Sequence, residues 1–166
     1  MTFLESIDRL LVKAETALIV LFLGAMVLLA FAQVVLRNIF DTGLLWGDPL
    51  VRHLVLWVGF TGAAVATSER RHISIDALTK FFPPRMKSIA HVITNVFALY
   101  VCLVLADAAF TFLAGEKEAG GMITLSIPSW VGIVIIPPGY ALIAFHFVVK
   151  LVESIAAVFG NQPEPT

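Results

Sequence analysis

Residues 16–36 read TALIVLFLGAMVLLAFAQVVL and contain no charged side chain. An α-helix rises about 1.5 Å per residue, so about 20 apolar residues cross the roughly 30 Å hydrocarbon layer of a bilayer. An open strand of this composition would leave its backbone groups unpaired in lipid, and the alternation expected of a barrel strand is missing. The stretch therefore predicts a transmembrane helix.

Three further apolar runs have the length of a membrane span, and they cover residues 50–66, 89–113 and 128–149. Of the 166 residues, 59% are hydrophobic and 14% are charged. Soluble domains have about 45–50% and about 25%. We therefore predict an all-α integral membrane protein with four transmembrane helices, which form a single membrane domain over residues 1–166.

The basic residues are divided unevenly between the two sides that these spans define. Cytoplasmic loops of membrane proteins carry an excess of Lys and Arg. This rule predicts that both termini and the connection of residues 67–88 are cytoplasmic, the N-in/C-in topology. Of the 11 basic residues, that side holds Arg9, Lys13, Arg70, Arg71, Lys80, Arg85, Lys87 and Lys150, and the other side holds Arg37, Arg52 and Lys117.

Residues 1–14 precede the first span and have apolar residues at helical spacing, with charged residues mostly opposite. This pattern predicts an amphipathic helix lying in the membrane interface. A longer, tilted first helix is the alternative. The apolar positions are Phe3, Leu4, Ile7, Leu10, Leu11 and Ala14. We do not expect cleavage after Ala32, because Glu5, Asp8 and Glu15 leave the preceding segment without a clear positive charge.

Polar side chains inside the spans are costly, so they usually face protein or water. Asp107 and Arg52 lie at similar predicted depth on the third and second spans, and we predict that they form an ion pair. Binding of a proton or sodium ion by Asp107 is the alternative. His91 and His146 also share a predicted depth, and two such histidines are able to ligate a haem. Both lie close to the interface, where histidine is readily solvated, so we predict no cofactor.

The fourth span contains Pro137, Pro138 and Gly139, which remove two backbone donors and predict a helix kink. The second span carries small residues at Gly59, Gly62, Ala63 and Ala64. Small residues allow a partner helix to approach closely, so this face is our predicted subunit contact; packing within the chain's own helices is the alternative.

Several functional classes are excluded by the sequence. It contains no Gly-rich phosphate loop, no nucleophile elbow and no His-Glu pair at metal-binding spacing, so we predict that the chain is not an enzyme. The net charge of −1 provides no basic stripe for nucleic acid. The single cysteine, Cys102, lies inside an apolar run and is interpreted as a packing residue.

Three stretches resemble a known family, the DctQ-type small membrane subunit of tripartite ATP-independent periplasmic (TRAP) transporters. They are WGDPLVRH at residues 46–53, WVGFTGAA at residues 57–64 and RHISID at residues 71–76. The family typically has two acidic residues after the first aromatic, whereas this chain has Gly47 and then Asp48. IPSW at residues 127–130 and IPPG at residues 136–139 also fit the family.

The resemblance implies a small permease subunit in the bacterial inner membrane. It would stabilise, as a scaffold, a large permease subunit that carries the sodium and substrate sites, and a periplasmic binding protein would deliver the substrate. Organic acids are the family's usual substrates. We expect the partner contact to involve Trp46, Asp48, Arg52, Trp57, Gly59, Gly62 and Ala63.

The connection of residues 67–88 holds two further groups of predicted functional residues. His72 and Asp76 are expected to share one helical face as structural polar residues, and Arg70 and Arg71 to contact phospholipid headgroups. Two other functions stay open, which are a haem-bearing anchor of a respiratory complex and an autonomous, homo-oligomeric transporter.

Overall fold

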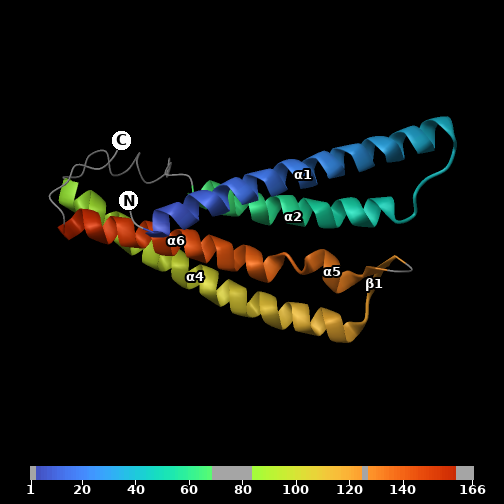
Figure 1. Cartoon of the computed structure of the whole chain (residues 1–166). Coiled ribbons are helices and arrows are strands. Elements are labelled where there is room, and N and C mark those ends of the chain that lie inside the picture. The colour runs from blue at the N-terminus through green and yellow to red at the C-terminus, as the bar shows by residue number, and fades with distance from the viewer. Residues whose placement is uncertain (1–2, 69–83, 125–126, 160–166) are drawn as a thin grey trace.

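The computed structural model describes residues 3–68, 84–124 and 127–159, and most of them are helical (Figure 1). Four long helices account for the fold. They are α1 (Phe3–Ile39), α2 (Gly47–Ser68), α4 (Pro84–Ala119) and α6 (Ile136–Phe159), with a short helix α5 (Ser129–Ile133) before the last. The strands β1 (Met122–Thr124) and β2 (Ile127–Pro128) form a small antiparallel hairpin.

Four helical segments are long and apolar enough to cross a membrane, which confirms the predicted fold class of a multi-pass helical membrane protein. The segments are Ile7–Ile39, Gly47–Ser68, Ile89–Ala119 and Ser129–Ile155. The first has 33 residues and is therefore about 50 Å long, well beyond the roughly 30 Å that a span needs. It must tilt or extend out of the bilayer.

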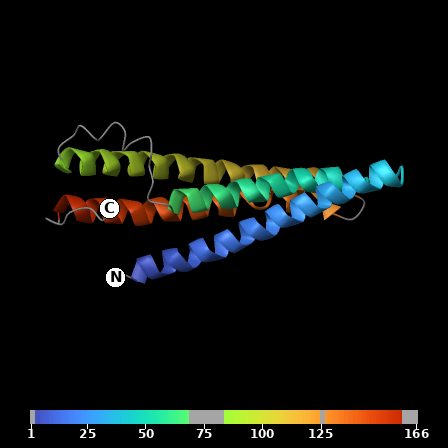
Figure 2. The same cartoon turned by 90° about the horizontal axis from the view of Figure 1, so that it is seen from above.

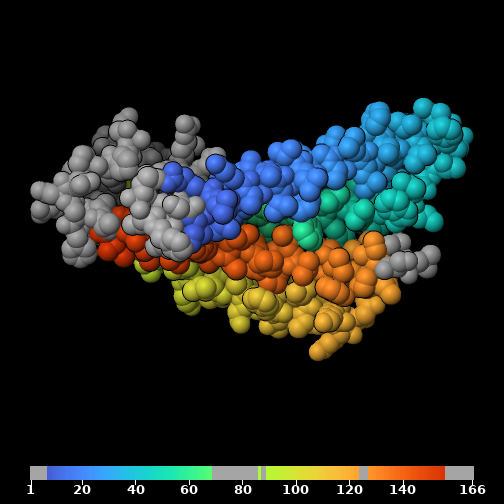
Figure 3. Space-filling view, in the orientation of Figure 1, coloured from blue at the N-terminus to red at the C-terminus, as the bar shows by residue number. Residues whose placement is uncertain are grey.

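The long helices form a row in the order α1, α2, α6, α4. Helix α2 packs against both α1 and α6, α6 also packs against α4, and α1 barely touches α6. Figures 1 and 2 show this arrangement from two directions, and Figure 3 shows α1 and α4 along opposite edges. The core is consequently thin, and one packed cluster of its buried residues consists of Ala64, Cys102, Ile143 and Ala144. The many exposed apolar side chains suit contact with lipid or with another membrane protein.

Helix α1 runs without a break from Phe3 to Ile39, so residues 3–14 are its first turns and not a separate helix. The longer first helix, which the sequence left as the alternative, is the arrangement found. Its inward face differs from the expected apolar one, because Glu15 is buried while Leu10 is 70% exposed. A position of residues 1–14 in the membrane interface stays a prediction.

The last span is interrupted at Val134–Ile135, just before the two prolines. Pro137 and Pro138 have no N–H to donate to the carbonyl groups one turn earlier, whereas proline fits well into the first turn of a new helix. The chain therefore ends α5 at Ile133 and restarts as α6 at Ile136. The kink predicted at Pro137, Pro138 and Gly139 is therefore a break between α5 and α6, and this break lies just before Pro137.

Helix α4 continues six residues beyond the predicted span, to Ala119, and ends at Gly120. Gly120 has a φ of 66°, the left-handed conformation that commonly terminates a helix and that glycine adopts without steric cost. The hairpin β1–β2 follows in the connection that the sequence analysis expected to be irregular. The molecule thus has an N-terminal end and, opposite it, a hairpin end (Figure 1).

Two buried glycines bring α2 against α5 and α6. A Cβ atom on Gly132 would collide with the imidazole of His53, and one on Gly139 would lie 2.6 Å from Cδ1 and 2.9 Å from Cβ of Phe60. His53 and Phe60 are two turns apart on α2, as are the two glycines on the opposing segment. We call these four residues the glycine seam.

We expect Gly139→Ala to lower the free energy of unfolding by about 1–3 kcal/mol, because Phe60 would have to move at its Cβ atom. Gly115→Ala is the matched control, since nothing lies within 4 Å of a Cβ atom there. Alanine at a helical site of that kind is neutral or stabilises by up to about 1 kcal/mol. Thermal unfolding in detergent, followed by tryptophan fluorescence, measures both variants, and equal midpoints would contradict the close approach at the seam.

Candidate functional site

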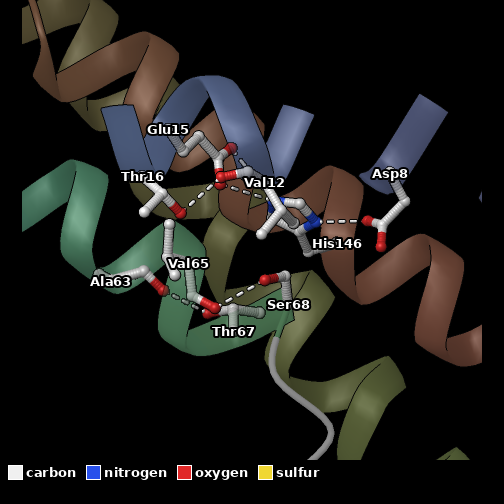
Figure 4. Close-up of polar contacts among 9 residues, drawn as sticks. All are labelled: Asp8, Val12, Glu15, Thr16, Ala63, Val65, Thr67, Ser68 and His146. Carbon is white, nitrogen blue, oxygen red and sulfur yellow. Dashed lines mark hydrogen bonds and ion pairs between the residues drawn. The ribbon is translucent and has the colours of Figure 1, made fainter. Parts of the chain in front are cut away.

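A buried histidine joins the first and last long helices at the N-terminal end. His146 on α6 is 1% exposed. Its Nδ1 atom lies 2.7 Å from Oδ1 of Asp8, and its Nε2 atom lies 3.1 Å and 3.2 Å from the two carboxylate oxygens of Glu15 (Figure 4). Asp8 and Glu15 are two turns apart, so they occupy the same face of α1. We call these three residues the α1–α6 clasp.

The clasp satisfies both sides of the imidazole ring. Nδ1 faces Asp8 and Nε2 faces Glu15, so each ring nitrogen has a carboxyl group as its hydrogen-bond partner. Glu15 is 3% exposed, and a buried carboxyl group without a partner is strongly unfavourable. His146 on α6 thereby satisfies the buried acid on α1, and it ties α1 to a helix that it otherwise hardly contacts.

Further polar contacts at this end link α6 to α4. The Asn95 amide on α4 donates to the Ser154 hydroxyl at 3.1 Å, and that hydroxyl donates to the Lys150 carbonyl at 2.8 Å. The Lys150 side chain is buried one turn beyond His146 and has an interaction of its own. The N-terminal end of the row is therefore held by polar groups, in contrast to the mainly apolar middle.

The two histidines of the haem alternative have different surroundings. Both ring nitrogens of His146 are hydrogen-bonded to carboxyl groups. His91 does not belong to the clasp, and within the described ranges no three His, Cys, Asp or Glu residues are grouped so as to hold a metal ion. The sequence analysis noticed the depth of His146 but overlooked its partners. The sequence does contain a signal for these partners, because Asp8 and Glu15 lie seven positions apart in the N-terminal part of the longest helix.

A glutamine organises the connection between α1 and α2 at the hairpin end. The Gln33 amide nitrogen donates to Asp48 Oδ1 at 3.0 Å and to the Leu44 carbonyl at 3.2 Å, and its oxygen accepts from the Leu44 N–H at 3.1 Å. A Cβ atom on the buried Gly47 would lie 2.7 Å from Cδ of Gln33. A side chain at position 47 would therefore require the Gln33 amide to move.

The predicted partner-contact residues of α2 divide between two directions. Trp57 points into the molecule, where its Nε1 donates to the Gly132 carbonyl at 2.9 Å and its ring meets Phe22 edge-on at 5.1 Å. The indole thus satisfies a carbonyl at the interrupted helix. The outward set consists of Arg52, Gly59 and Ala63, with Trp46 partly exposed beside them and Gly62 half-buried.

The predicted ion pair between Arg52 and Asp107 is wrong. Both side chains are exposed, and they lie on α2 and α4, which are separated by α6 in the row. The sequence correctly places both residues toward the hairpin end. It could not show that α6 lies between the two helices that carry them. His72, Asp76, Arg70 and Arg71 lie outside the described residues.

We expect His146→Gln to lower the free energy of unfolding by about 3–5 kcal/mol, because it leaves the buried Glu15 carboxyl group without its imidazole partner. His91→Gln, a partly exposed site on α4 at the same end, is the matched control and should change stability by less than about 0.5 kcal/mol. Denaturation in mixed micelles measures both variants. The double variant Glu15→Gln/His146→Gln should recover part of the loss, and strictly additive losses would contradict a direct pair.

The fold defines a multi-pass helical membrane protein. Most of the polar side chains described above join its own helices to one another. Residues 26–157 match the family model of tripartite ATP-independent periplasmic transporters, DctQ component, so the chain belongs to that family. The resemblance inferred from the sequence is thereby confirmed. The family consists of transport components and not of enzymes, in agreement with the sequence analysis.

Three relatives illustrate the relationship. A putative TRAP transporter small permease protein of Haemophilus influenzae is 30% identical over 107 residues, which cover 64% of this chain and 66% of the relative. The C4-dicarboxylate TRAP transporter small permease protein DctQ of Vibrio cholerae is 28% identical over 59% of this chain and 42% of its own length. The matches thus span less than two thirds of these relatives. The sialic acid TRAP transporter permease protein SiaT of Haemophilus influenzae is 30% identical over 45% of this chain, but over 12% of its own length.

Proposed function

We propose that this TRAP small permease subunit acts as a scaffold for a large permease subunit in a sodium-coupled transporter that a periplasmic binding protein supplies with organic acids. The observation that carries the proposal is the open row of helices. The most apolar stretch of α1 contains no buried residue, and both edges of the row expose large apolar side chains. A chain with so little interior relies on a larger neighbour for much of its packing.

The rigidity of the row supports a scaffold role. The glycine seam joins α2 to α5 and α6, while the clasp joins α1 to α6. An element of a transporter that moves during transport needs a fixed neighbour against which to move. Two tightly packed contacts at different heights make the row suitable for that task.

The relatives support both the partner and the substrate class. The match to SiaT covers only a small part of that permease protein, so a sequence of this kind also occurs inside a much longer permease chain. This relationship favours direct contact between the small subunit and a large one. The names of the relatives include C4-dicarboxylate and sialic acid, both of which are carboxylic acids. The residues that choose the substrate would lie in the partner proteins.

The location that we propose is the bacterial inner membrane, with both termini in the cytoplasm. The distribution of Lys and Arg supports this orientation. The outward residues of α2, with Gly59 and Ala63 at their centre, stay a proposed partner contact, and Arg70 and Arg71 stay proposed contacts of phospholipid headgroups.

Uptake in proteoliposomes tests the proposed function. With the large permease subunit, the binding protein and a sodium gradient present, we expect organic-acid uptake to require this chain, because the large subunit is unsupported without it. The two membrane subunits should also co-purify from detergent. Liposomes that contain this chain alone are the control, and transport by them, or equal uptake without the chain, would overturn the proposal.

A further inference from the structure

Helix α4 has one face that packs inside the molecule and one that points away from it. The inward face carries Asn95, Cys102 and Ala109, all buried against α6. The outward face lies along the edge of the row in Figure 3. Its exposed residues recur at spacings of three and four, and they are Ile93, Val96, Tyr100, Leu103, Asp107 and Phe110.

Asp107 is the one acidic or basic residue of α4 between His91 and Glu116. It lies inside the apolar segment Ile89–Ala119, about 13 Å along the axis from Glu116. The Thr111 hydroxyl bonds to its backbone carbonyl. In the part of the chain that the structure describes, no hydrogen bond or ion pair reaches its carboxylate.

Lipid is a poor neighbour for this carboxylate. Long Lys and Arg side chains near a helix end can extend to the headgroups, but the side chain of aspartate is much shorter. Charged residues within a span therefore face water, protein or an opposite charge. Among the described residues, the outward face around Asp107 is mainly apolar, with the Thr111 hydroxyl one turn away and bonded to the Asp107 backbone carbonyl.

The outward face of α2 does not pose the same problem. Gly59 and Ala63 are apolar, and Arg52 lies within two turns of the start of α2, from where its long side chain can reach the headgroups. Lipid can therefore cover α2. The two faces are unequal candidates for a partner, because covering Asp107 requires an opposite charge or water.

We propose that the outward face of α4 around Asp107 docks onto a transmembrane helix of the large permease subunit that places an Arg or Lys opposite the carboxylate. This inference rests on the proposed function, since it assumes that the two subunits assemble. Charge complementarity within the hydrocarbon layer selects the partner, and the neighbouring Tyr100, Leu103 and Phe110 supply the apolar surface around the pair.

A second copy of the chain fits this face less well. Its exposed basic residue at comparable height is Arg52, which lies on α2 and not on the outward face of α4. Pairing Arg52 of one copy with Asp107 of another would join two different helices. A two-fold dimer would have to bring both helices of each copy into one interface, although α6 separates them.

Co-purification with the large subunit tests the proposal. We expect Asp107→Asn and Asp107→Leu to reduce the amount of recovered large subunit about tenfold, because each leaves the partner's buried cation unpaired. Asp41→Asn, an exposed acid in the α1–α2 connection, is the matched control and should recover as much as the wild type. The thermal midpoint of the isolated subunit should stay unchanged in all three variants, since the Asp107 carboxylate has no partner among the described residues and Asp41 is exposed.

The outcomes separate the two proposals. If the wild-type chain recovers no large subunit, the proposed function itself fails. If the wild type recovers it and Asp107→Asn recovers as much, the proposed function stands and the docking face is wrong.

Photo-crosslinking locates the contact independently of affinity. A photo-reactive amino acid in place of Leu103 on α4 should form adducts with the large subunit in the assembled complex, whereas one in place of Leu28, an exposed residue of α1, should label lipid. Adducts from position 103 with lipid alone, or with a second copy of this chain, would overturn the proposal. If the adduct maps next to an Arg or Lys of the large subunit, Asp107→Lys combined with an acidic replacement there should restore recovery.

Discussion

The two halves of this protein, α1–α2 and α4–α6, meet along the glycine seam, and the remaining architecture depends on that close approach. Gly132 and Gly139 leave room for His53 and Phe60, so α2 lies near enough for the Trp57 indole to reach a carbonyl at the interrupted helix. The interruption and the seam support each other. Two prolines remove backbone donors next to the place where a neighbouring helix supplies one.

The clasp and the glycine seam join helices by different interactions. The clasp uses polar contacts between His146 and two acidic residues, whereas the seam uses close packing at two glycines. In a bilayer, apolar side chains gain little by turning from lipid to protein, so close packing and polar contacts decide how helices associate. Helix α1 packs against α2 along much of its length. His146 gives it a second attachment, to α6, by pairing with Asp8 and with the buried Glu15.

Hydropathy alone was sufficient to predict the four spans and the fold class, since length and composition determine what crosses a bilayer. It could not predict the order of the helices, because nearly every face of each helix is apolar. For the same reason the predicted ion pair between Arg52 and Asp107 was wrong. The two residues lie at similar height, but on α2 and α4, which α6 separates. We assigned Trp57 to a partner contact because the sequence shows a large side chain beside small ones. It does not show the direction in which the indole points. The clasp was missed since its members are more than 130 residues apart in the chain.

The distribution of polar groups explains why this architecture suits a supporting subunit. Gln33, Asp48 and His146 each bond within the chain, at one end or the other, and so fix helices instead of lining a path for a solute. Asp107 departs from this pattern: a carboxylate is costly in hydrocarbon, and the described residues offer it no compensating contact. If the proposed partner supplies the opposite charge, the assembled subunit is more favourable than the isolated one. The proposed pair would then also set the register of the assembly, because an opposite charge satisfies the carboxylate at only one depth.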